Sequence, residues 1–472
     1  MRNVENFAII IGVVWHSVKW GVCYMKDLTS GNLSKTFLRF AIPAILAGLL
    51  GQAYAIIDSI IIGKFLGTES LAALGSTGEF LSLIDAIFWG YGVGCGIYVA
   101  KLFSAGDNLK LRNTIIATLL TESLVAVFLG VVLIALHQPL LDLLRVDPLI
   151  RKEAAQYFCI IVGGLVVQNF GWLGVYLTNA LGISSFPLYM SIISCLINIA
   201  GNLLSVLALD AGVVGVALST IFAATIVALC YVIKFLKIFR ELGAFGKFSM
   251  AGYFRGAIPY AIPSMFQQCL IYIANASITP LVNANGFAAT AAFSVSRKYY
   301  NLVASIYQNS TKVMANFTSQ CTGNGRYERI RDGIWIILRQ STLFVLPLLL
   351  ICILFPTFMA SLFFNAETPL ESYTLAAPFL RFFLPLVLFN LVNNLFHAIL
   401  KGLKSTRLLM LSSFIGCITY VVAGYTFEPF WGLYGIYAAL ALSWITEAIF
   451  AAIIYLSGRW QTPAMRKALE NT

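Results

Sequence analysis

The chain has 472 residues, of which 59% are hydrophobic and only 11% are charged, and its formal net charge is +11. With a mean hydropathy of +0.85, it has too little polar surface to cover a soluble globule, which excludes soluble enzymes and binding modules. The composition predicts an all-α polytopic membrane protein.

The first 24 residues are an extra N-terminal segment with two open interpretations. The stretch "FAIIIGVVWHSVKWGVCYM" has an apolar core of about nine residues before His16 and Lys19, which is short for a span and similar to the hydrophobic region of a signal. In one interpretation Met25 is the natural start, because "MKDLTSGNLSKTFLRF" is a polar, basic lead-in to the first span. In the other the segment crosses the membrane, which moves the N-terminus outside.

Twelve apolar segments then follow, each long enough for a helix to cross a hydrocarbon core of about 30 Å. Their apolar runs are continuous and do not alternate with period two, which disfavours a barrel of strands. The predicted spans are 36–63, 72–101, 113–136, 153–178, 186–208, 212–236, 256–282, 287–318, 333–356, 372–400, 407–427 and 431–456.

Basic residues gather on alternate connections and predict the orientation of the chain. One set of segments carries most of them: Lys101, Lys110, Arg112, Lys234, Lys237, Arg240, Lys247, Arg255, Arg326, Arg329, Arg331, Lys401, Lys404, Arg407, Arg459, Arg466 and Lys467. The positive-inside rule places these segments in the cytoplasm, together with both functional termini and the tail 458–472. The expected location of the protein is the inner membrane of the cell. The positive charge therefore needs no nucleic acid to explain it.

The sequence contains an internal repeat. A shift of 216 positions places "FLRFAIPAILAGLLGQ" on "YFRGAIPYAIPSMFQQ", so that Pro43 meets Pro259. The repeat predicts two six-helix bundles of parallel orientation, an N-lobe at 25–236 and a C-lobe at 256–457, joined by a basic cytoplasmic linker at 237–255. Two such bundles leave a cavity along their shared axis, and rocking about it gives alternating access, so the sequence predicts a transporter. Pro43 removes a backbone donor inside the first span and is the predicted hinge.

The chain resembles the MATE family of multidrug and toxic compound extrusion antiporters over residues 26 to 457. The resemblance rests on Pro43, on the Asp58 that precedes "SIIIGKFLG", on the turns "SAGDN" and "CTGNG", and on "GVVGVALST" at the start of the sixth span. It implies a two-lobed antiporter with twelve helices that expels organic cations in exchange for protons or sodium.

Asp58 is the predicted coupling residue. A buried carboxylate is costly if it stays charged and unpaired, so it is expected to protonate or bind a cation. In similar MATE proteins an Asp at this point joins polar residues of the fifth and sixth spans, which here are Asn198, Asn202 and Thr220. This sequence departs from the family at Asn202, where many members have a second Asp, and the site can then neutralise one positive charge. Alternatively, these polar groups only join helices.

The predicted C-lobe lacks the acids of the sodium-coupled branch of the family, whose positions hold Gln267 and Asn390 here. His397 can titrate near neutral pH, although a lone membrane histidine is more often a packing residue. Arg297 and Lys298, in the eighth span, suit an anionic substrate better than an organic cation. These five residues are candidates for a substrate cavity.

Three classes of function remain open. The first is a secondary drug antiporter that needs no cofactor beyond a proton or Na⁺ as coupling ion, binds no structural metal, and works as a monomer in the bilayer. The second is an exporter of lipid-linked or anionic metabolites on a related fold. The third, a membrane enzyme, ranks last because the sequence contains no HExxH, GxSxG or P-loop motif, which also argues against ATP-driven pumping.

Overall fold

The computed structural model describes residues 27–144, 146–363, 370–461 and 465–466. The structure is 87% helical, and the described residues contain no strands. The predicted extra segment 1–24 and most of the predicted tail lie outside the described residues.

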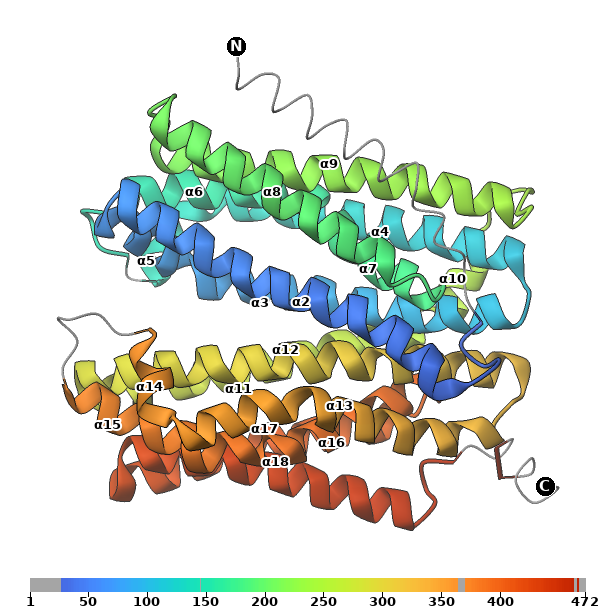
Figure 1. Cartoon of the computed structure of the whole chain (residues 1–472). Helices are drawn as coiled ribbons and strands as arrows, with labels where there is room; N and C mark the ends of the chain where they lie inside the picture. Colours follow the sequence, from blue (N-terminus) through green and yellow to red (C-terminus); the bar gives the residue numbers. More distant parts are fainter. Residues whose placement is uncertain (1–26, 145, 364–369, 462–464, 467–472) are drawn as a thin grey trace. The chain divides into compact units, whose positions relative to one another are not determined.

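Each of the twelve predicted spans corresponds to one long helix or one broken helix (Figure 1). Nine of these have the length and apolar composition to cross a membrane, and the bent pair α6 and α7 makes a tenth. The remaining two, α11 and α12, are not among the described helices that meet both conditions. The all-α fold of twelve helices is therefore confirmed, with these bounds in the first half: α2 Leu33–Phe65, α3 Thr68–Ser104, α4 Asn108–Ala135, α6 Arg151–Gly163, α7 Leu165–Ala180, α8 Ser185–Leu207 and α9 Gly212–Glu241.

The second half contains α11 Ile258–Ala284, α12 Gly286–Asn324, α13 Glu328–Leu354, α15 Leu370–Pro378, α16 Val387–Gly402, α17 Thr406–Trp431 and α18 Leu433–Leu456. Between α15 and α16 the chain forms a π-helical turn at Phe379–Phe383 and a 3-10 turn at Leu384–Leu386, which contains Pro385. Short helices lie outside the spans: α5 His137–Leu143, α10 Ala251–Gly256 and α14 Pro356–Ser361.

Contacts divide the chain into two units, and the division falls inside α2. Residues 46–257 form the first unit, whereas Leu28–Ile45 group with residues 258 onward in the second. Several contacts explain why the start of α2 belongs to the second unit: the ring of Phe37 packs edge-to-face on Phe317 at 4.9 Å, and Gln340 donates to the carbonyl of Ser34 at 3.0 Å. The change of unit occurs two residues after Pro43.

In the first unit, α3, α4, α6 and α7 pack around a core of Ile84, Phe88, Ala126, Phe158, Val162 and Leu165. The axis of α6 and α7 bends by 54° at Gly164. A Cβ at Gly164 would lie 2.0 Å from Ile221 Cδ1, so the glycine lets α9 approach the bend closely.

The segment after α9 is held against α4 by hydrogen bonds. Arg112 of α4 donates to the carbonyls of Ala244 and Gly246, and Asn108 donates to the carbonyl of Leu242 at 2.9 Å. The helix α9 itself continues to Glu241, beyond the predicted start of the linker at residue 237, where Lys237 and Glu241 lie 4.0 Å apart as an i, i+4 pair.

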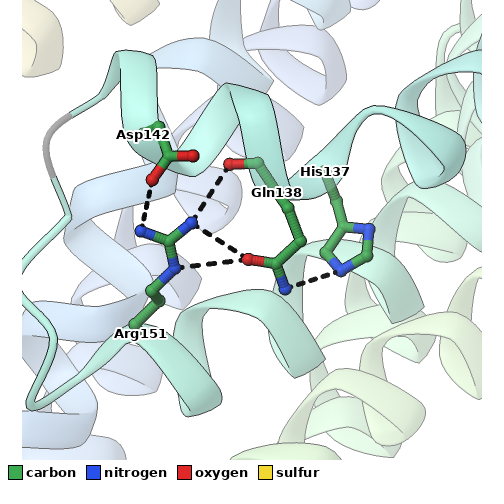
Figure 2. Close-up of polar contacts among 4 residues, drawn as sticks. All are labelled: His137, Gln138, Asp142 and Arg151. Atoms are coloured by element: carbon green, nitrogen blue, oxygen red, sulfur yellow. Dashed lines mark hydrogen bonds and ion pairs between the residues drawn. The ribbon is translucent and has the colours of Figure 1, made fainter.

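A polar cluster joins α5 to the start of α6 (Figure 2). Arg151 forms an ion pair with Asp142 at 2.5 Å and donates to the side chain and the carbonyl of Gln138. Gln138 donates in turn to His137 Nε2 at 3.0 Å, while His137 Nδ1 lies 2.7 Å from the carbonyl of Ile134. Because Gln138 donates to Nε2, Nδ1 is the ring nitrogen that donates to the carbonyl of Ile134.

Candidate ion-coupling site

The structure brings Asp58, Asn202, Asn198 and Thr220 into one chain of hydrogen bonds within the first unit. Asn202 Nδ2 donates to Asp58 Oδ1 at 2.5 Å and to Asn198 Oδ1 at 2.8 Å. Asn198 Nδ2 donates to Thr220 Oγ1 at 2.9 Å, and Thr220 donates to the carbonyl of Val216. Helices α2, α8 and α9 thus each contribute to the chain.

The local sequence of α8 explains how two asparagines can serve one carboxylate. Asn198 and Asn202 are four residues apart, so both lie on the same face of the helix. They are 2% and 0% exposed, whereas Asp58 is only half-buried. The pair therefore forms a fixed, buried support for a carboxylate that remains more accessible.

Asn202 also has an unused acceptor. Its Nδ2 faces two acceptor oxygens, which fixes the orientation of the amide. No donor in the described part of the chain reaches the buried Oδ1. A buried acceptor without a partner costs about 1–3 kcal/mol, so the site favours an additional donor or cation.

Two tyrosines that the sequence did not single out interact with this site. Tyr54 lies one turn before Asp58 on α2 and interacts with both Asp58 and Thr220. Tyr157 of α6 interacts electrostatically with Asp58 and with Asp85 of α3. The i, i+4 spacing of Tyr54 and Asp58 is a signal that could have identified the first of them.

Two of the predicted C-lobe residues, Gln267 and His397, meet directly. Gln267 Nε2 donates to His397 Nδ1 and to Ser413 Oγ, each at 3.0 Å, and His397 Nε2 lies 2.9 Å from Ser412 Oγ. Gln267 is 2% exposed and His397 is 8% exposed. With Nδ1 as acceptor, Nε2 carries the proton, so this cluster holds a neutral imidazole by hydrogen bonds.

The other three C-lobe residues do not join that cluster. Tyr300 connects two of them: Asn390 donates to its hydroxyl at 3.1 Å, and the guanidinium of Arg297 lies 5.9 Å from its ring centre. Arg297 also donates to Asn275 at 2.9 Å, whereas Lys298 lies over the ring of Phe363 at 5.0 Å. The ion pairs found among the described residues, Arg151–Asp142 and Lys237–Glu241, involve neither Arg297 nor Lys298.

Comparison with known proteins finds one matching family model and several curated relatives. The family model MatE matches residues 7–204 and 263–426. Two curated relatives from Bacillus subtilis are the probable multidrug resistance proteins YpnP, 22% identical over 92% of this chain and 97% of its own, and YoeA, 23% identical over 63% and 67%. A FAD transporter of Shewanella oneidensis is 23% identical over 74% of this chain and 78% of its own.

Solved structures share the fold. A mutant of the Vibrio cholerae MATE transporter VcmN has a TM-score of 0.85 at 18% identity, over 92% of this chain and 98% of its own. A transporter of the MOP superfamily from Pyrococcus furiosus, described as having a binding pocket of reverse polarity, has a TM-score of 0.84 at 18% identity, over 93% of this chain and 98% of its own.

Proposed function

Because this chain belongs to the MatE family of membrane transporters, we propose that it is a secondary multidrug efflux antiporter that exports organic cations. Protons or sodium ions entering through Asp58 drive the exchange, and the lobes rock to give alternating access. The chain of hydrogen bonds from Asp58 to Thr220 is the observation that carries this proposal. The names of the two Bacillus relatives support the drug substrate.

The mechanism uses the difference between charged and neutral Asp58. A proton or Na⁺ taken up from outside neutralises the carboxylate, and the first span then repacks about Pro43 and releases substrate outward. Linkage requires that bound substrate favours the deprotonated acid by the same factor. Because the site has one carboxylate among amides and a hydroxyl, it binds one proton or one Na⁺ at a time.

The test is ethidium efflux from energised cells that express the wild type or Asp58→Asn, at two pH values with and without sodium. Asparagine keeps the size of the side chain but cannot bind a proton, so we expect efflux to follow the proton gradient in the wild type and to vanish in the variant. The matched control is Asp107→Asn, an N-cap residue at the start of α4, which should keep wild-type efflux. Efflux that persists in Asp58→Asn contradicts the assignment and moves coupling to another acid, with Asp85 first.

A second candidate is the export of anions. Arg297 and Lys298 have no ion-pair partner within the described part of the chain, and one relative is a FAD transporter, whose substrate carries phosphates. This candidate predicts that the wild type gives no drug resistance and that Arg297→Gln and Lys298→Gln abolish export of a dinucleotide from loaded vesicles.

A further inference from the structure

A second carboxylate–asparagine pair lies in the other unit. Glu447 is half-buried near the middle of α18, and its Oε2 accepts a hydrogen bond from Asn393 Nδ2 of α16 at 3.1 Å. Asn393 is 1% exposed and also donates to the carbonyl of Trp444 at 3.0 Å. The helix α17 completes the surroundings, because a Cβ at Gly416 would lie only 2.2 Å from Glu447 Oε1. The glycine leaves the space that the carboxyl group occupies.

The free amide oxygen of Asn393 points to a ligand. Both contacts of Nδ2 are to acceptors, so the orientation of the amide is fixed. The buried Oδ1 has no hydrogen-bond partner among the residues that the structure describes. Asn202 beside Asp58 shows the same pattern, with its Nδ2 on the carboxylate and its Oδ1 unused. A carboxylate cannot fill this acceptor, whereas a protonated carboxyl group has the donor that it lacks.

Within the part of the chain that the structure describes, Glu447 forms no ion pair with a positively charged group. Tyr300 and Tyr307 of α12 and Cys417 of α17 interact with it electrostatically, and all three are neutral when protonated. Arg297 of α12 contacts Tyr300 and Asn275, and no described base forms an ion pair with Glu447. An unpaired carboxylate at this depth of a bilayer is costly, so the charged form needs a compensating event.

We propose that Glu447 and Asn393 form a second proton-binding site, separate from Asp58, that is loaded and emptied during transport. In the loaded state the carboxyl C=O accepts from Asn393 Nδ2 and its O–H donates to Asn393 Oδ1, which satisfies every polar atom of the pair. In the emptied state Oδ1 loses its donor and the carboxylate keeps one hydrogen bond. The site rests on the proposed antiport for its role, but its proton binding does not depend on any substrate.

The first test is chemical labelling of the purified full-length chain in detergent, without substrate. Dicyclohexylcarbodiimide modifies protonated carboxyl groups in apolar surroundings, and mass spectrometry maps the modified residue. We expect a Glu447 adduct at acidic pH that disappears as the pH rises, in the wild type and in Asp58→Asn. The matched control is Glu428→Gln, near the end of α17, where Asn285 donates to the carboxylate at 2.7 Å; it should leave the Glu447 adduct unchanged. The absence of an adduct at every pH, or an adduct that ignores pH, would overturn the proposal.

A second measurement counts protons and separates the two proposals. After a jump from alkaline to acidic pH, a pH-indicator dye should report one proton fewer for Glu447→Gln than for the wild type, and two fewer for Glu447→Gln combined with Asp58→Asn. An unchanged count for Glu447→Gln contradicts the second site even where ethidium efflux is normal. Conversely, if the wild type shows no ethidium efflux but Glu447→Gln still binds one proton fewer, only the proposed transport function is contradicted. Protection of Glu447 from labelling by Na⁺ at constant pH would assign the pair to sodium and overturn the proton assignment.

Discussion

At the scale of single residues, the hydrogen bonds of each polar group distinguish residues that hold helices together from residues that can bind a proton or a cation. Asn198, Thr220 and Ser412 have their hydrogen bonds within the protein, and His397 is held as a neutral ring by Gln267 and Ser412. Asn202 and Asn393 each keep one buried acceptor unused beside a carboxylate. The sequence placed Asp58 correctly in an apolar run, but it did not distinguish Asn393 from the other asparagines of its helix. The spacing of Asn390, Asn393, Asn394 and His397 on one face of α16 was the available signal.

The ion pair of Asp142 and Arg151 gives a prediction for pH. The hydrogen bond from Arg151 lowers the pKa of the Asp142 carboxyl below its ordinary value. A lowered pKa means that the pair stabilises the fold above the unfolded-state pKa of aspartate, and that this contribution is lost as the pH falls through the folded-state pKa. We therefore expect Asp142→Asn to lower the Tm in detergent slightly at neutral pH and to leave it unchanged in strong acid. A Tm difference that grows in acid would contradict the role of the pair.

At the scale of helices, glycines and prolines decide how closely and how straight the spans pack. Gly164 allows the 54° bend between α6 and α7 to approach α9, and Gly416 leaves space for Glu447. The sequence predicted each helix because twenty or so apolar residues identify a span. It did not predict the bend or the π-helical turn at Phe379–Phe383, because these depend on packing against neighbouring helices.

Gly435 tests this close packing at the turn from α17 to α18. A Cβ at this position would lie 2.5 Å from the backbone oxygen of Phe427, which cannot move without displacing the helix. We expect Gly435→Ala to destabilise the protein by about 1–3 kcal/mol, measured as a lower Tm in detergent. Gly75→Ala in α3 is the control, because its added Cβ meets nothing within 4 Å and should be neutral or stabilise by up to about 1 kcal/mol. Equal Tm values for the two variants would contradict this explanation.

Pro43 tests the proposed hinge of α2. Pro43→Ala restores a backbone N–H that can donate to the carbonyl four residues earlier, which stiffens the helix close to the point where it changes unit. We expect efflux to slow by about tenfold, which corresponds to about 1.4 kcal/mol in the barrier, while the number of protons bound after the pH jump is retained. Pro347→Ala inside α13 is the matched control and should transport normally. Equal rates in both variants would contradict the hinge.

At the scale of the whole molecule, the basic connections predict how the chain lies in the membrane. The segment after α9 carries Phe245, 77% exposed, and the connection before α6 carries Leu149, 72% exposed. The positive-inside rule places the first in the cytoplasm and the second outside. In a cysteine-free background that retains efflux, an impermeant maleimide should label Leu149→Cys in intact cells and Phe245→Cys only after permeabilisation. The reverse pattern would contradict the proposed orientation.

The sequence by itself determined the membrane class, the twelve spans, the repeat and the family, because hydropathy and charge depend on local composition that a linear chain displays directly. Only the tertiary structure decided which polar side chains meet. Asp58 and Asn202 are 144 positions apart, and Asn393 and Glu447 are 54 apart, so their pairing depends on the depth, rotation and bending of packed helices. The same packing left the acceptor of each asparagine unused, which no pattern of residues along the chain encodes.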